Sequence, residues 1–195
     1  MLAQGAIDRF DAMKPLPQTP MNVDEYLAWS EANPGRYELV QGKVYAMAAE
    51  RARRARTRVA VFDALRSAVR GAGVGCEAMP DGMTVRIDAH TAYEPDALIY
   101  CGPRIGPDAI EVKNPVIVVE VLSSSTRRID ASEKLIGYFQ VPSIHHYLMV
   151  DPDRRTVVHH RRAGDRIDTA FIQDGSLRLD PPGLELSIPA LFEEP

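Results

Sequence analysis

Residues 115–122 read Pro-Val-Ile-Val-Val-Glu-Val-Leu, with apolar side chains on both alternating faces. This pattern predicts a strand that is buried on both sides within an α/β sheet. A carboxylate inside such a strand must be neutralised, paired or bound to a metal, because an isolated buried charge is strongly unfavourable. We therefore expect Glu120 at the carboxyl end of the strand, where open α/β sheets place their ligand sites, with a cation beside it. A purely structural ion pair at the strand end is the alternative.

The composition is that of a soluble globular protein. The chain has 195 residues, of which 45% are hydrophobic and 26% are charged, and this length suits a single domain. Residues 1–20 end in a proline-rich stretch and are expected to form a tail or strap, which leaves residues 21–195 as the domain. No apolar run reaches the roughly 18 residues of a membrane span, and no signal-peptide pattern opens the chain. These features predict a cytoplasmic protein that makes no membrane contact.

The charge balance and the cysteines narrow the classes of function. A net charge of −4 argues against a globally basic coat for nucleic acid. It leaves room for an enzyme that meets nucleic acid through a local basic face while its carboxylates hold cations. Cys76 and Cys101 lack the spacing of metal ligands and the density of a disulfide scaffold, so we expect them to be reduced thiols.

The pattern of apolar residues, glycines and prolines predicts alternating helices and strands. Helices are expected at about 22–29, 50–70 and 130–140, with a small helix near 189–193. The long helix should end at Gly71 and bury Val59, Phe62, Leu65 and Val69. Strands are expected at 37–40 and 43–47, around a Gln41-Gly42 turn, and at 75–79, 83–88, 97–101, 115–122, 144–150 and 156–158, followed by a β-meander.

Two further charged residues stand near the Glu120 strand. Asp96, in a Pro-Asp step, opens directly into the apolar strand at 97–101 with no turn residues after it. Lys134 lies near the start of the helix at 130–140, where a cation is unfavourable for the helix dipole. A strand-capping aspartate and a solvated surface lysine are the alternatives. Two acids and a lysine around one point would suit Mg²⁺-dependent hydrolysis of a phosphodiester bond.

The sequence resembles the Uma-type family of restriction-endonuclease-like proteins. The similarity lies in Pro95-Asp96, in Glu120 within Val-Val-Glu-Val-Leu-Ser-Ser-Ser-Thr, in Lys134 within the segment 133–152, and in the hairpin segment 37–47. That family belongs to the PD-(D/E)XK nuclease superfamily, and the resemblance covers about residues 22–170. It implies an α/β fold with a restriction-endonuclease-like core, in which a four-stranded mixed central sheet is flanked by helices and carries extra hairpin and meander strands. The site would lie at one end of that sheet.

The resemblance also implies residue roles. Asp96 and Glu120 match the metal-binding acids, and the cofactor would be Mg²⁺ or Mn²⁺. The superfamily's lysine is displaced to the next helix, since Leu122 stands in its usual position and Lys134 matches the displaced one. Glu38 matches an N-terminal acid that serves as a further metal or water ligand. A cross-strand salt bridge from Glu38 to Lys43 or Arg36 is an equal alternative.

The sequence departs from the family at the start of the long helix. Family members commonly have a histidine-containing segment there, whereas residues 50–58 of this chain are rich in arginine. Arg51, Arg54 and Arg58 share one helical face, which we interpret as a face that binds the nucleic-acid backbone. A solvated basic face is the alternative. His145-His146 and His159-His160 are expected to be structural, because adjacent residues in a strand point to opposite faces and cannot chelate jointly.

These observations predict a metal-dependent endonuclease that acts on DNA. The alternative is a catalytically inactive nuclease-fold module that binds nucleic acid or a protein partner. A two-carboxylate glycosidase is less favoured, because a single Trp gives no sign of an aromatic sugar cleft. A homodimer is compatible with the sequence. Substrate strandedness and any recognition sequence are not encoded in a recognisable motif.

Overall fold

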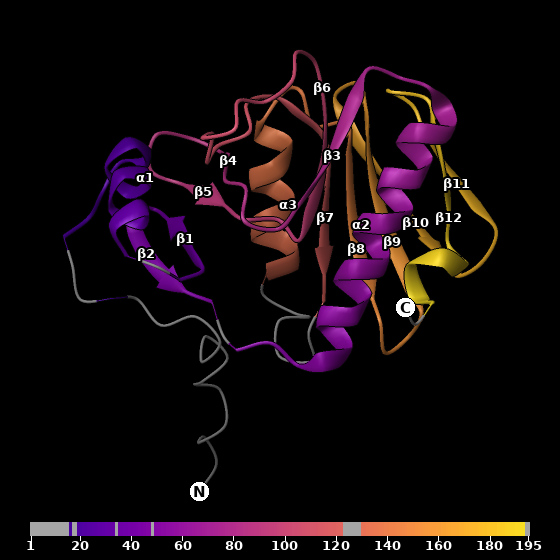
Figure 1. The fold of residues 1–195 in the computed structure, drawn as a ribbon, viewed down its shortest axis with the longest axis horizontal. Helices are drawn as coiled ribbons and strands as arrows, with labels where there is room; N and C mark the ends of the chain where they lie inside the picture. The colour runs from indigo at the N-terminus through magenta and orange to yellow at the C-terminus, as the bar shows by residue number, and fades with distance from the viewer. Residues whose placement is uncertain (1–15, 17–18, 34, 48, 123–129, 194–195) are drawn as a thin grey trace, which may run out of the picture.

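The computed structural model describes residues 16, 19–33, 35–47, 49–122 and 130–193. Most of the tail expected at 1–20, and the Ser-rich turn expected after the Glu120 strand, lie outside these residues. A six-stranded mixed sheet forms the centre of the molecule (Figure 1). Its strands, in sheet order, are β10 (Arg166–Ile172), β9 (Thr156–Ala163), β8 (His146–Asp151), β7 (Pro115–Val121), β6 (Ala97–Cys101) and β3 (Cys76–Pro80). This sheet is larger than the four-stranded core expected from the sequence.

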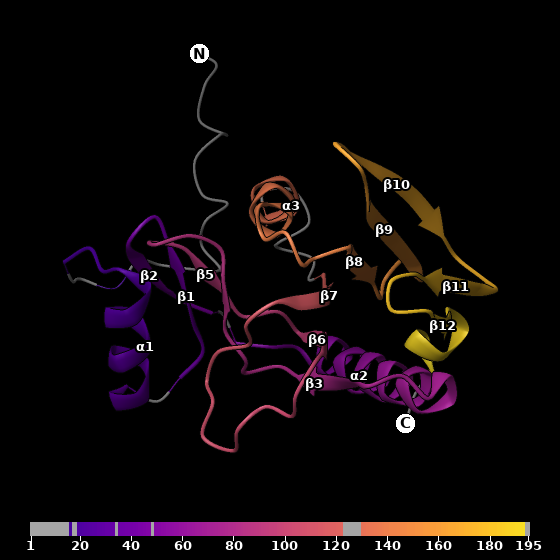
Figure 2. The ribbon, with the colours of Figure 1, turned by 90° about the horizontal axis from the view of Figure 1, so that it is seen from above.

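Strand β7 lies inside the sheet, as its apolar pattern predicts. It pairs antiparallel with β6 and parallel with β8, and the connection from β7 to β8 contains α3 (Asp130–Gln140). The long helix α2 (Ala52–Ala72) covers the opposite face, so that β7 has a helix on each side (Figure 2). Alternate residues of β7 divide between these two layers. Val119 packs with the core under α2, and Val118 packs with Tyr138 of α3.

The buried stripe of helix α2 matches the predicted one at Leu65, with Val69 partly buried against the same core, and differs from it elsewhere. Its buried residues are Thr57, Val61 and Leu65, four positions apart, whereas Val59 is 50% exposed. The prediction for Val59 was wrong because it followed hydrophobicity alone, and the helix turns Thr57 and the polar first turn toward the sheet. The helix ends at Gly73 instead of Gly71, in the left-handed region at φ 63°, where glycine carries no steric cost.

A second, four-stranded antiparallel sheet lies beside the α3 side of the main sheet (Figures 1 and 2). Its order is β2 (Lys43–Ala46), β1 (Tyr37–Val40), β5 (Ala92–Tyr93) and β4 (Val85–Arg86), and it packs against α1 (Val23–Ala32). The predicted hairpin around Gln41-Gly42 is confirmed, and both turn residues have positive φ. The strand expected at 83–88 shortens to two residues. This sheet matters for the site because β1 carries Glu38.

The C-terminal part completes the α2 side of the core. The hairpin of β11 (Ser176–Leu179) and β12 (Leu184–Ser187) is followed by a 3₁₀ helix at Pro189–Phe192, close to the predicted small helix. Leucines of this hairpin pack with Leu65 of α2. No helix in the described ranges is long and apolar enough to cross a membrane.

The cysteines do not match the expectation of free thiols. Cys76 and Cys101 form a disulfide. The two residues stand directly opposite each other in the antiparallel register of β3 and β6, a relation that their sequence separation of 25 does not reveal. The bond fastens β3, one edge of the main sheet, to its neighbour. At the far end of the same strand pair lie Asp81 and Asp96, which belong to the candidate site.

Reduction of this disulfide should lower the stability of the fold. Closing a loop of this length removes conformational entropy from the unfolded chain, which corresponds to about 3 kcal/mol. We expect a reducing agent to lower the melting temperature of the wild-type protein, measured by circular dichroism. The double variant Cys76→Ala/Cys101→Ala serves as the control and should melt at one temperature with or without the reductant. A reductant-insensitive wild type would contradict the pairing.

Candidate active site

The carboxyl end of β7 meets the amino end of β6 at one end of the main sheet, where the strands terminate. Ala97 pairs with Val119 in the antiparallel ladder, and Asp96 and Glu120 are the residues next to this last pair. The Asp96 N–H donates to the Val119 carbonyl at 3.0 Å, so Asp96 bonds to the same residue that pairs with Ala97. Both carboxylates are buried, with Asp96 2% and Glu120 7% exposed. The two predicted metal acids are therefore neighbours at the end of the sheet.

Glu120 has the cation that its buried position requires. The Lys134 ammonium donates to Glu120 Oε1 and to Glu38 Oε1, each at 2.8 Å. Tyr138, one helical turn after Lys134, donates its hydroxyl to Glu120 Oε1 at 2.7 Å. Glu38 Oε1 also accepts the backbone N–H of Glu94 at 3.0 Å. The cluster thus joins β1, β7 and α3, which belong to different layers of the fold.

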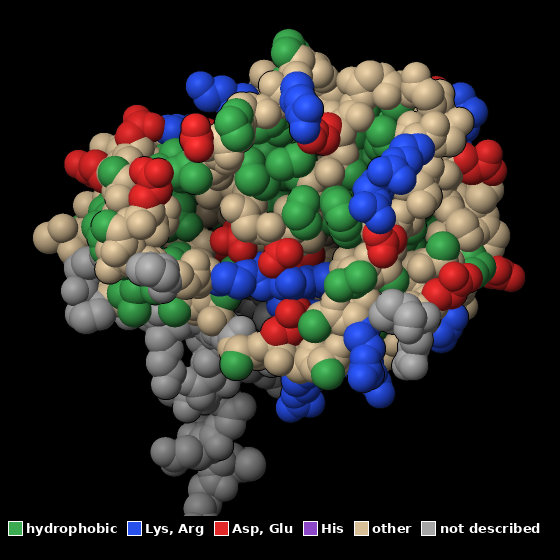
Figure 3. Space-filling view, viewed as in Figure 1, with side chains coloured by type: hydrophobic (Ala, Val, Ile, Leu, Met, Phe, Trp, Pro, Cys, Tyr) green, Lys and Arg blue, Asp and Glu red, His purple; other side chains and the backbone are tan. Residues whose placement is uncertain are grey.

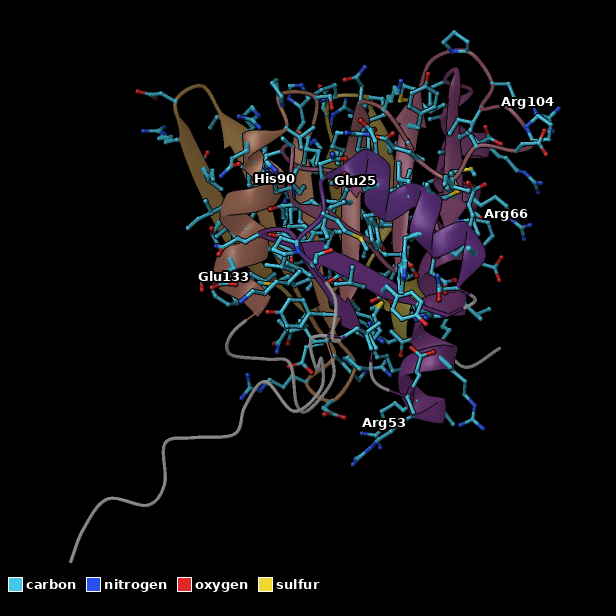
Figure 4. The ribbon with its side chains drawn as sticks, turned by 90° about the vertical axis from the view of Figure 1, so that its left-hand side faces the viewer. Glu25, Arg53, Arg66, His90, Arg104 and Glu133 are labelled. Carbon is cyan, nitrogen blue, oxygen red and sulfur yellow. A yellow bond between two sulfur atoms is a disulfide. The ribbon has the colours of Figure 1, made fainter. Side chains whose placement is uncertain are left out.

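Close packing of Tyr93 against α3 holds Lys134 in this cluster. The Lys134 ammonium lies 5.4 Å from the centre of the Tyr93 ring, within the range of a cation–π contact. A Cβ at Gly137 would lie 2.7 Å from the same ring, so the helix can approach Tyr93 only because residue 137 has no side chain. Glu133, the sequence neighbour of Lys134, points away from the cluster at the outer side of α3 (Figure 4).

Asp96 is held by arginines from α2. Arg54 Nη2 donates to both Asp96 oxygens, at 2.9 and 2.7 Å, and Arg54 Nε donates to the Val121 carbonyl at 2.8 Å. The Val121 N–H donates to Asp96 Oδ2 at 2.7 Å. Arg58 Nη1 and Arg36 Nη2 lie at 3.7 and 3.8 Å from Asp96 Oδ1. Burial of the carboxylate is therefore offset by three guanidinium groups and one backbone donor.

Further acids surround these arginines. Arg58 pairs with Asp81 at 2.9 Å and with Glu50 at 3.4 Å, while Arg36 donates to Glu94 at 2.8 Å. The site then contains four bases (Arg36, Arg54, Arg58, Lys134) and six acids (Glu38, Glu50, Asp81, Glu94, Asp96, Glu120). If all are ionised, two negative charges remain in excess. Figure 3 shows basic side chains bordered by acidic ones in the middle of one face.

Several polar atoms in this cluster lack a hydrogen-bond partner. Within the described part of the chain, these buried atoms are Arg36 Nη2, Arg58 Nε, Arg58 Nη1 and Glu50 Oε1. Arg36 Nη2 and Arg58 Nη1 lie at ion-pair distance from acids but make no hydrogen bond, which leaves unsatisfied donors in the cluster.

The environment shifts the pKa values of the central groups. Burial raises the pKa of Asp96, and the nearby Glu120 carboxylate raises it further, against the opposing effect of Arg54. Burial also raises the pKa of Glu120, although Lys134 opposes this shift. For Lys134, burial lowers the pKa, but the carboxylates of Glu120 and Glu38 outweigh it and hold the pKa well above its ordinary value. Lys134 is therefore a protonated cation and a hydrogen-bond donor at neutral pH.

The site residues named from the sequence separate into two groups. Asp96, Glu120, Lys134 and Glu38 lie together, whereas Arg51 is an exposed residue at the start of α2 and makes no side-chain cap bond. Arg54 and Arg58 face the acids of the site instead of lying on an open basic surface. Among the described residues, Glu38 forms neither of the salt bridges considered for it, with Lys43 or Arg36.

The sequence reading missed several contributors to the site. Asp81 gave no signal in the sequence, although it follows β3 directly and pairs with Arg58. Tyr138 could have been found from its spacing, because it lies four residues after Lys134 on the same helical face. Glu94 and Arg36 carried no signal, since their pairing depends on how β1 and β5 meet.

The histidine pairs lie away from this site, and His159 and His160 point to opposite faces of β9, as predicted. His159 Nε2 lies 2.9 Å from His146 Nδ1, while His160 Nδ1 lies 2.8 Å from the Thr169 hydroxyl. Burial lowers the pKa of both His146 and His159 to about 4, so both are neutral at physiological pH. No group of three or more His, Cys, Asp or Glu side chains within the described ranges forms a ready cage for a metal ion.

Comparison with known proteins identifies the family. A model of the Uma2 family, described as "putative restriction endonuclease", matches residues 23–190, which is most of the chain. The chain belongs to the Uma2 family. The match includes all four residues of the predicted acid and lysine set, so the resemblance drawn from spaced motifs is confirmed at the level of the family.

Relatives and a solved structure agree with this assignment. An uncharacterised Synechocystis protein is 25% identical over 179 residues, covering 90% of this chain and 93% of the relative. A second uncharacterised Synechocystis protein is 28% identical over 81 residues, covering 40% and 46%. The crystal structure of "a putative nuclease belonging to DUF820" from Anabaena variabilis has a TM-score of 0.68 at 18% identity, and the match covers 89% of this chain and 98% of that one. This Uma2 protein therefore shares the fold of that solved structure.

The raised pKa of Glu120 predicts a pH-dependent effect of Glu120→Gln. A carboxyl group whose folded-state pKa exceeds its unfolded value stabilises the fold below the unfolded value and loses that contribution as pH rises through the folded value. Glutamine does not titrate, so Glu120→Gln should gain stability relative to wild type as pH rises above about 4.5. Urea unfolding of both proteins without divalent metal, from acidic to neutral pH, measures this difference. A difference that is constant with pH would contradict the shift.

Proposed function

We propose that this Uma2 protein is a metal-dependent nuclease that hydrolyses phosphodiester bonds in DNA. The observation that supports the proposal is the proximity of the buried Asp96 and Glu120 carboxylates at the end of the sheet, with the Lys134 ammonium bound to Glu120. Two adjacent carboxylates offer the oxygen ligands that Mg²⁺ and Mn²⁺ prefer. The excess negative charge of the cluster would be offset by one divalent cation. The family description, "putative restriction endonuclease", supports DNA as the substrate.

The residues present fit a divalent cation under one condition. Asp96 and Glu120 would hold it, and Glu38 shares the Lys134 ammonium with Glu120. Arg54 at present binds both oxygens of Asp96, so at least one of its hydrogen bonds must open when a cation binds. A bound Mg²⁺ would activate a water molecule and offset charge that develops on the phosphate.

The bases of the site have separate proposed tasks. Lys134 is protonated and fixed between two acids, so it would donate a hydrogen bond to the attacked phosphate or the attacking water, and would not act as a base. Arg58 and Arg36 have unpartnered guanidinium donors and would bind a non-bridging or neighbouring phosphate oxygen. Arg54, once displaced from Asp96, would join them. Arg51 would contact the nucleic-acid backbone farther from the bond that is cleaved.

The second candidate function is a nuclease fold without turnover that binds nucleic acid or a protein partner. The Arg54–Asp96 pair favours it, because a guanidinium group neutralises the acid that a metal would otherwise need to neutralise. A cytoplasmic location and a homodimer stay predictions. Disulfides such as Cys76–Cys101 are more frequent in proteins of oxidising compartments.

Cleavage of DNA by Lys134 variants tests the proposed function. With Mg²⁺ or Mn²⁺, the parent should cut plasmid or short duplex DNA, and Lys134→Ala should cut roughly 10² times more slowly because a donor to the transition state is lost. Lys134→Arg should restore little, since a planar guanidinium does not replace a compact ammonium between two carboxylates. Calorimetric titration with Mn²⁺ should show that Lys134→Ala still binds the metal.

Lys113→Ala is the matched control, because Lys113 is exposed and lies outside the cluster. It should cleave as fast as the parent. Equal cleavage by Lys134→Ala and the parent would remove Lys134 from the reaction. A parent that binds DNA but never cuts it with any divalent metal would favour the non-catalytic alternative.

A further inference from the structure

One edge strand of the main sheet is free along its outer side in the described part of the chain, and its two charged residues, Arg166 and Asp168, pair with each other. Strand β10 is the outermost strand beyond β9, and no strand in the described ranges pairs with its free side (Figure 2). It contains seven residues without proline, glycine or a register shift in its pairing with β9. Long, regular and unprotected edges are templates for pairing with another strand.

The exposed side chains of β10 are apolar on one face. Ile167 is 40% and Phe171 is 75% exposed, and both belong to the small set of large hydrophobic residues that the structure leaves in solvent. They lie on the same face as Thr169, because residues two apart in a strand share a face. The charged residues of the strand, Arg166 and Asp168, lie on the other face. Cross-strand contacts between apolar side chains on the first face would therefore remove apolar surface from water without burying a charge.

The opposite edge of the sheet has a different character. Strand β3 is shorter, ends in Pro80 and contains no exposed large hydrophobic residue. Its position is fixed by the disulfide to β6. Proline at an edge limits further pairing, because it lacks the backbone donor. Of the two edges, β10 is the one suited to association.

The sequence of β10 is complementary to itself. Thr169 is the central residue of Arg166–Ile172, so two copies that pair antiparallel around Thr169 overlap along all seven residues. In that register Ile167 of each copy stands opposite Phe171 of the other copy. Asp168 meets Ala170 and Arg166 meets Ile172, so no like charges face each other. A register centred on Asp168 would place two aspartates opposite one another.

We infer that β10 is the surface through which two copies of this chain associate, by antiparallel strand pairing centred on Thr169. The two main sheets then continue into one another across a two-fold axis. Pairing of one short strand buries less than the roughly 800 Å² per partner of a standard stable interface, so the dimer is weak and depends on concentration. The inference is independent of nuclease activity.

Sedimentation equilibrium over concentrations from about 1 µM to about 1 mM tests the surface. The wild type should pass from monomer to dimer, and Ile167→Lys/Phe171→Lys should remain a monomer throughout, because it places charges on the apolar face. Val59→Lys is the matched control, since Val59 is equally a half-exposed apolar residue but lies on α2. It should dimerise like the wild type. A wild type that stays monomeric, or a double variant that still dimerises, overturns the inference.

Cysteine cross-linking tests the register. Directly opposite residues in an antiparallel pair are about 4.5–5.5 Å apart at Cα, which suits a disulfide. Thr169→Cys should therefore form a covalent dimer under mild oxidation, whereas Ala170→Cys, which faces Asp168 of the other copy, should not. Both variants keep the native disulfide, and circular dichroism checks that they are folded. Equal cross-linking of the two variants overturns the proposed register.

Discussion

The buried Lys134 ammonium is the interaction on which the arrangement of the site depends. It binds one carboxylate from β1 and one from β7 and is itself carried by α3, so it links the small sheet, the main sheet and a helix. Removing one partner of a buried pair leaves an uncompensated charge, which costs about 3–5 kcal/mol. The same contact explains two details of packing nearby. Tyr93 lies against the ammonium, and Gly137 lets the helix approach that ring.

A second charged link closes the site from the other side of the sheet. Arg54 of α2 donates hydrogen bonds to both carboxylate oxygens of Asp96 and to the Val121 carbonyl. The bond to Val121 fixes the end of β7. The two acids at the end of the sheet are thus neutralised by cations from opposite helices. This division places a lysine on Glu120 and an arginine on Asp96. It gives the Uma2 protein a closed state in which each of the two acids has a cation beside it, and the proposed metal-bound state differs from it by the release of Arg54.

The sequence alone was sufficient for the parts of the fold that follow from local patterns. The apolar run of β7 predicted a buried strand, and Glu120 required a cation, which the structure supplies as Lys134. The hairpin around Gln41-Gly42 followed from turn chemistry. What could not be predicted depends on register between distant strands. Cys76 meets Cys101, and Asp81 meets Arg58, only because of how β3, β6 and α2 are placed. The hydrophobic pattern also led to the wrong prediction that Val59 is buried, because the buried side of α2 begins with polar residues that face the site.

The position of a bound metal ion would show whether Asp96 and Glu120 together form the metal site. A crystal structure with Mn²⁺, located by its anomalous scattering, would show which side chains coordinate the ion. We expect one ion with ligands from both Asp96 and Glu120, at about 2.0–2.3 Å, and an Arg54 guanidinium that has left at least one Asp96 oxygen. An Arg54–Asp96 pair that stays intact at saturating Mn²⁺, with any ion bound elsewhere, would contradict it.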